Sequence, residues 1–179
     1  NGEIDMRMQN DIIINGKSLD TILALHNKFF RKGILSLFSK GQIADLSGCD
    51  LHGAQIQKVN LNGANLSGAN LITANLSGSS LIGTLLNGAN LYRATLIQAQ
   101  FIQADLSGSN LKWANFHGAF FKGVNFGGAN ISEAHFESAY FDNIINILDT
   151  EGLETANFKD AKFDEKTKQL LASVNETVK

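Results

Sequence analysis

Residues 64–78 read ANLSG-ANLIT-ANLSG, which is one five-residue unit written three times in succession. Each unit has a large apolar residue at its centre, here Leu66, Leu71 and Leu76, which we call position i. The residue at i−2 is small, and the residue at i−1 is polar. Outward from this stretch, the central residue is Leu, Phe or Ile in every unit from Leu46 to Phe141, which makes twenty units without a gap.

A period of five suits neither a helix nor a plain strand. Five residues of an α-helix advance about 500°, so the large residues would spiral around the helix, and a strand would alternate them between its two faces. A chain that turns a corner once per unit can send one large and one small side chain inward each time. Four corners close a square coil of twenty residues, and glycine at i+2 in eleven of the twenty units supplies the positive φ that such corners need. Proline is absent from the chain, as expected where each rung must donate its N–H to the next coil.

The units at 64–68 (Ala-Asn-Leu-Ser-Gly), 69–73 (Ala-Asn-Leu-Ile-Thr) and 104–108 (Ala-Asp-Leu-Ser-Gly) resemble the pentapeptide-repeat family of cyanobacteria and other bacteria, whose unit is A-(D/N)-L-x-x. The resemblance covers residues 44–143. It implies an all-β solenoid, a right-handed quadrilateral β-helix, here of about five coils plus a partial sixth. It does not imply a function, although the best-known group of the family binds DNA gyrase or topoisomerase as a DNA mimic.

Segments outside the repeats are expected to form short helical caps at both ends of the column. Residues 1–43 are interpreted as a strand and helix cap, with a strand at 12–14 and a helix that starts after Ser18. Its apolar spacing runs through Leu19, Ile22, Leu23, His26, Phe29 and Phe30, and it stops near Gly33. Asn1 to Asp5 is either a cloning scar or the cut end of a leader.

The five-residue register breaks after Asn143 and resumes at Leu153, where position 146 was expected. Residues 144–152 are therefore predicted to be an outlying insertion of seven extra residues that leaves the column. A partial coil is expected over 153–164, and a capping helix over 165–179.

Composition excludes several classes of protein. The chain has 15 Lys+Arg against 17 Asp+Glu, so no strong field for nucleic acid or an anionic membrane is expected. No apolar run approaches the about 20 residues of a membrane span. The single cysteine, Cys49, cannot form a disulfide within the chain, which favours the cytoplasm, with the periplasm or a lumen open if a leader was removed.

Large outward side chains suggest where a partner could bind. Residues twenty apart should be neighbours on adjacent coils, so the sequence can be laid out as a surface map. Two groups stand out, and Arg93 is expected to form a cation–π pair with Trp113. The first group is Ile72, Tyr92, Arg93 and Trp113, and the second is Ile82, Ile102, Phe120 and Tyr140. The alternative is that these side chains form ladders that only stabilise the stack, or that the caps fold over them.

Candidate chemistry is sparse, so no catalytic, cofactor-binding or metal-binding residue is assigned. His117, His135 and Glu137 share one face, but a surface hydrogen bond is favoured over a metal site. The predicted function is a non-enzymatic protein-interaction or scaffold module with an unknown protein partner, as a monomer or an end-to-end homodimer. The alternative is a gyrase-directed DNA mimic, which is disfavoured because residues 44–143 hold six acidic residues against four basic ones.

Overall fold

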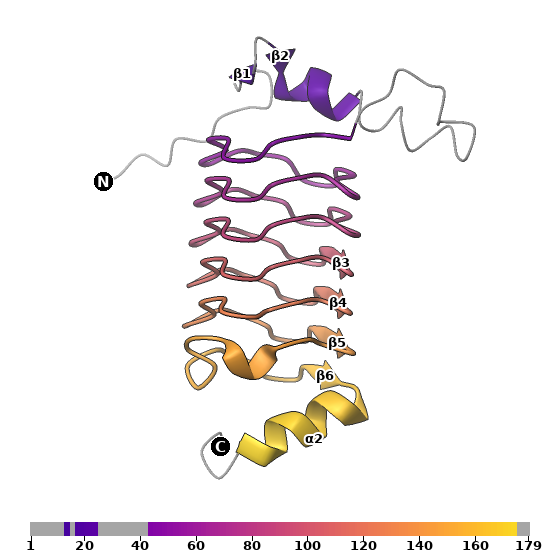
Figure 1. Cartoon of the computed structure of the whole chain (residues 1–179), viewed down its shortest axis with the longest axis vertical. Helices are drawn as coiled ribbons and strands as arrows, with labels where there is room; N and C mark the ends of the chain where they lie inside the picture. Colours follow the sequence, from indigo (N-terminus) through magenta and orange to yellow (C-terminus); the bar gives the residue numbers. More distant parts are fainter. Residues whose placement is uncertain (1–12, 15–16, 25–42, 175–179) are drawn as a thin grey trace, which may run out of the picture.

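The repeats stack into a single column in the computed structural model, which describes residues 13–14, 17–24 and 43–174 (Figure 1). Backbone bridges join residues twenty apart, such as Asp45 with Asn65 and Asn70 with Asn90, which confirms the predicted offset per coil. Longer pairing occurs on one face, where four strands form a parallel sheet in chain order. These strands are β3 (Gln100–Ile102), β4 (Phe120–Lys122), β5 (Tyr140–Asp142) and β6 (Lys162–Phe163).

The corners of the coil repeat one backbone conformation. The residue at i+2 has a positive φ in all twenty units from Gly48 to Asn143, eleven times as glycine and nine times as another residue. In most units the N–H of residue i+3 donates to the carbonyl of residue i, as from Ala64 to Leu61 at 2.9 Å. Positive φ confined to i+2 together with this bond is the pattern of a type II turn, so each tight corner is a β-turn.

The polar residue at i−1 has a structural role that the repeat pattern alone did not reveal. Its side-chain oxygen accepts the N–H of residue i+1, as in the 3.1 Å bond from Ser67 to Asn65 Oδ1. Where the residue is Asn, its amide can also donate to the coil before it, as from Asn70 Nδ2 to Asp50 Oδ1 at 2.9 Å. A short side chain with an oxygen at its tip therefore satisfies a corner N–H, which accounts for the frequency of Asn and Asp there.

The core is a continuous rod of stacked side chains. Each central residue from Leu46 to Phe141 is at most 1% exposed. Leucine dominates the first coils, and phenylalanine dominates the later ones. Phe121 stacks on Phe101 at 5.0 Å and on Phe141 at 4.9 Å, and Phe163 continues this stack into the last coil. Because the core fills the column throughout its height, the outward side chains are the ones available for binding.

The N-terminal segment starts with a short hairpin of β1 (Ile13–Ile14) and β2 (Lys17–Ser18), followed by helical residues 19–24. Ser18 Oγ accepts the N–H of Thr21 at 3.3 Å, as predicted for the start of the helix. Leu19 and Leu23 are buried against the core cluster. The other expectations for this segment, which involve Asn1 to Asp5, Ile12, His26, Phe29, Phe30 and Gly33, fall outside the described residues.

Residues 144–152 remain in the wall of the column, which corrects the predicted outlying insertion. Ile145 pairs with Asn125, and Glu151 pairs with Asn130, so the offset grows from 20 to 21 residues. The offset then grows by one more residue, which brings Asn157 opposite His135. The register predicted from the sequence assumed five residues in every unit. The chain instead keeps an apolar residue inward and takes up an extra residue in the 3₁₀ helix η3 (Ile147–Asp149).

Helix α2 (Glu165–Val174) follows β6 below the last coil (Figure 1). Asp164 begins the helix, because its carboxylate accepts the backbone N–H groups of Lys166 and Thr167 and the hydroxyl of Thr167. The same carboxylate accepts the N–H of Asn143 at 2.8 Å, which ties the helix to the coil above it. Burial opposes its ionisation, but these bonds outweigh burial and lower the pKa of Asp164 to about 2. Residues 175–179 of the predicted helix lie outside the described residues.

Candidate interaction surface

The outward residues at i−1, i+1 and i+2 cover the sides of the column, and two patches carry large side chains. The corner patch consists of Ile72, Tyr92, Arg93, Lys112 and Trp113. The sheet patch consists of Ile82, Ile102, Phe120 and Tyr140. The sequence predicted all of these residues except Lys112, which the stacking places directly below Tyr92.

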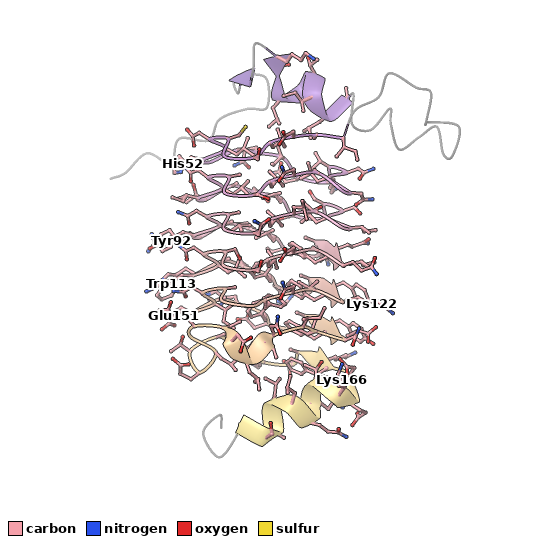
Figure 2. The ribbon with its side chains drawn as sticks, in the orientation of Figure 1. His52, Tyr92, Trp113, Lys122, Glu151 and Lys166 are labelled. Carbon is pink, nitrogen blue, oxygen red and sulfur yellow. The ribbon has the colours of Figure 1, made fainter. Side chains whose placement is uncertain are left out.

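The corner patch lies where the second face, through Leu51 and Leu91, turns into the third. Tyr92 and Trp113 lie along the same edge of the column in Figure 2. The N–H of Arg93 donates to the carbonyl of Lys112 at 3.1 Å, so the two coils are in direct register there. Tyr92 therefore stands above Lys112, and Arg93 stands above Trp113, which is 41% exposed.

Arg93 forms its cation–π contact with Tyr92 rather than with Trp113. Its guanidinium carbon lies 5.3 Å from the centre of the Tyr92 ring, within the same turn. No such contact with Trp113 occurs in the part of the chain that the structure describes, which corrects the expected pair. The indole of Trp113 is among the most exposed large apolar side chains of the described residues.

The corner patch also differs from the other corners in its backbone chemistry. At the corner after the first face, the i+2 residue is glycine in five stacked units, at 48, 68, 88, 108 and 128. At the corner patch, the i+2 residues of four consecutive coils carry side chains at positive φ: Thr73, Arg93, Trp113 and Glu133. A side chain in this conformation costs about 1 kcal/mol relative to glycine. The fold does not need these side chains, because glycine makes the same corner elsewhere.

Three residues of the sheet patch lie on β3, β4 and β5, and Ile82 lies in the coil before β3. The rings of Phe120 and Tyr140 are parallel, with centres 5.0 Å apart, and Tyr140 is 40% exposed. Beside them, Lys122 pairs with Asp142 at 2.9 Å. Part of this patch is thus occupied by contacts between neighbouring strands, as the ladder alternative predicts.

The histidine cluster on the third face forms a hydrogen-bond network. Glu137 Oε1 lies 3.1 Å from His135 Nδ1 and accepts a 2.6 Å bond from Asn157. Burial raises the pKa of Glu137, but a backbone hydrogen bond, the hydrogen bond with His135 and the charges of His135 and His117 together lower it. No group of three or more His, Cys, Asp or Glu side chains among the described residues is arranged to hold a metal ion.

Other exposed apolar residues were missed by the sequence analysis. Leu85 and Ile145 are 44% and 45% exposed at i−1 positions of the first face, where Asn or Asp is usual. Their departure from the repeat is the signal that could have found them. Asp105 and Asn125 separate the two in the stack, so they do not form a continuous patch.

Comparison with known proteins identifies the class of this column. The family model for pentapeptide repeats matches residues 44–71, 74–112 and 109–145 with eight copies, which together span more than half of the chain. The protein therefore belongs to the pentapeptide-repeat family, and its fold is a right-handed quadrilateral β-helix solenoid. A search of curated proteins found no match.

Solved structures of the same family resemble the chain. A pentapeptide repeat protein (Rfr23) from the cyanobacterium Cyanothece 51142 is 23% identical, with a TM-score of 0.50 over 68% of this chain and 88% of that one. One from the thylakoid lumen of Arabidopsis thaliana is 30% identical, with a TM-score of 0.42 over 55% and 68%. A third, from Nostoc PCC 7120, is 26% identical, with a TM-score of 0.43 over 79% and 93%. The described helices include none long and apolar enough to cross a membrane.

Proposed function

We propose that this protein is a non-enzymatic interaction module that binds a protein partner through the sides of its column. The observation that carries the proposal is the gathering of large side chains, Trp113 and Tyr140 among them, on a surface made mostly of polar residues. Clusters of exposed aromatic and apolar groups mark binding surfaces more often than single ones do. We further propose the cytoplasm as its compartment, since a chain with one cysteine needs no oxidising environment.

A binding role fits the polar side chains better than a catalytic one. The hydroxyl of Ser67 donates to Asn65 at 2.7 Å, and that of Ser77 donates to Asn75 at the same distance. These two hydroxyls serve the corners of the coil, and the neutral amide oxygens that accept their protons cannot act as bases to activate a nucleophile. The polar groups at these corners therefore support the fold.

The DNA-mimic alternative lacks the surface that it requires. A mimic of duplex DNA needs a dense acidic face, because DNA carries one charge per about 1.7 Å of its axis. The six acidic residues of the repeats are spread over all four faces, and one of them, Asp142, is paired with Lys122. The charge distribution thus favours a different kind of partner.

Site-specific crosslinking in cells tests the proposal. A photoreactive amino acid is placed at Tyr92 in one variant and at Tyr140 in another, with Ser107 on the plain first face as the matched control. We expect a discrete protein adduct from one of the patch positions and none from Ser107. Adducts of equal yield at all three positions, or none at any, would contradict a lateral binding surface.

A further inference from the structure

Four residues of the corner patch form a compact block of alternating chemistry. Tyr92 and Arg93 lie side by side in one coil, and Lys112 and Trp113 occupy the same two positions in the next. Each aromatic ring thus has a cation beside it along the chain and another cation directly above or below it. Tyr, Trp and Arg are the residue types most enriched among the side chains that dominate protein interfaces.

The two cations of this block have no acidic partner within the described structure. Lys122 is paired with Asp142, and Lys168 is paired with Glu165. Arg93 instead lies over the Tyr92 ring, and Lys112 is exposed and forms no ion pair with a described carboxylate. The block therefore presents two positive charges to the solvent.

The positions around the block leave this positive charge largely intact. Ile72 and Thr73 lie above it, and Ser132 and Glu133 lie below it. The flanking i−1 positions hold Asn90, Asn110, Thr95 and Asn115, all of which are neutral. Among these neighbouring positions, Glu133 is thus the one carboxylate, whereas the block itself carries two cations.

We infer that the block Tyr92, Arg93, Lys112 and Trp113 is the anchor for an acidic segment of a partner protein. Carboxylates of the segment pair with Arg93 and Lys112, while its apolar or aromatic groups pack on Tyr92 and on the exposed part of Trp113. This inference rests on the proposed function and narrows it to one patch and one partner chemistry. Arg93 and Trp113 both have positive φ, so glycine can replace either side chain without loss of the corner.

The same backbone conformation supplies variants that remove the anchor without harming the fold. Arg93→Gly and Trp113→Gly each introduce the residue that most corners already use. The matched control is Gln98→Gly with Gln103→Gly, because both glutamines are exposed i+2 residues at positive φ, but at other corners. The control therefore also replaces two i+2 side chains by glycine at positive φ, but at corners away from the block.

Selection of a random 12-residue peptide library on the full chain tests the inference. We expect the enriched peptides to carry a net negative charge and to bind the R93G/W113G variant roughly tenfold more weakly or worse, as measured by biolayer interferometry. Binding to the Q98G/Q103G control should be unchanged. Affinity should fall as salt is raised from about 50 to about 500 mM, because the charges are exposed.

Several results would overturn this inference. The first is that the enriched peptides carry no net negative charge. The second is that the Q98G/Q103G control loses as much binding as R93G/W113G. The third is that no enriched peptide binds the unmodified protein more tightly than it binds R93G/W113G. A single-stranded dT12 oligonucleotide that shifts Trp113 fluorescence at lower concentration than the peptides would also overturn it in favour of nucleic acid. If crosslinking from Tyr140 still yields a discrete protein adduct, the proposed function stands and only the corner anchor fails.

Discussion

Phe120 and Phe121 offer a matched test of which side chains hold the column together. They are adjacent in β4, and each stacks on the aromatic residue twenty positions later, Tyr140 at 5.0 Å and Phe141 at 4.9 Å. They differ in the side of the wall that they occupy. Phe121 is fully buried, whereas Phe120 is partly exposed. Replacing each by alanine removes the same atoms, so the difference in unfolding free energy reports the burial and ring packing that Phe121 has on the inner side of the wall.

Phe121→Ala should cost about 3–5 kcal/mol, the range for a buried phenylalanine. The upper part of that range is expected, because five neighbouring rings at 4.9–5.8 Å form the walls of the new cavity, and ladder bonds on both sides limit its collapse. Phe120→Ala should cost about 1 kcal/mol, the value of an aromatic pair with little added burial.

Equilibrium unfolding in urea, followed by far-ultraviolet circular dichroism, measures both changes. With a slope near 2 kcal/mol per molar urea, the midpoint should fall by about 1.5–2.5 M for Phe121→Ala and by about 0.5 M for Phe120→Ala. Equal shifts, or a larger shift for Phe120→Ala, would refute the assignment of inward and outward positions.

Three further predictions concern the lower end, the corner and the excluded partner. Asp164→Ala should destabilise the protein by about 1–2 kcal/mol through loss of the helix cap. Because the pKa of Asp164 is lowered to about 2, its contribution should be complete above about pH 4 and lost as the pH falls toward 2; a pH-independent difference in urea midpoint between wild type and variant over this window would contradict this. Trp113→Gly should change the unfolding free energy by less than about 1 kcal/mol, since relief of backbone strain offsets lost contacts, and a larger loss in thermal or urea unfolding would make Trp113 a structural residue. The purified protein should leave supercoiling by DNA gyrase unaffected in a gel assay, and inhibition at sub-micromolar concentration would revive the DNA-mimic hypothesis.

Much of this structure follows from the five-residue period. A central Leu, Phe or Ile in every unit can be buried in only one way, so the inward residues and the offset of twenty could be predicted. That offset alone also places Tyr92, Arg93 and Trp113 together on one corner. The N-terminal cap at Ser18 was predictable because a hydroxyl before a helical apolar pattern has a local partner.

Features that depend on more than spacing could not be predicted. The wall at Ile145 to Glu151 absorbs an extra residue in a 3₁₀ turn, because keeping an apolar side chain inward matters more than the count. Arg93 lies over Tyr92 rather than over Trp113, because a long, flexible side chain has several rotamers and the spacing of the residues does not decide among them. The pattern shows that a polar residue, often Asn or Asp, recurs at i−1, but the bonds of these side chains to corner N–H groups follow only from the turn geometry.

The binding of a partner by a column whose corner patch has been replaced would test the central claim most directly. Ile72→Ser, Tyr92→Ser, Arg93→Gly and Trp113→Gly give four of the five patch positions the residue types of the plain first face, while Lys112 and every inward residue stay the same. The measurement is the affinity of the crosslinked partner, once purified, for the intact protein and for this fourfold variant, with urea midpoints recorded alongside. We predict that the variant keeps its fold and loses affinity by roughly a hundredfold, as expected when a cluster of dominant contacts is removed. Unchanged affinity in a folded variant would contradict the claim that binding resides in this corner.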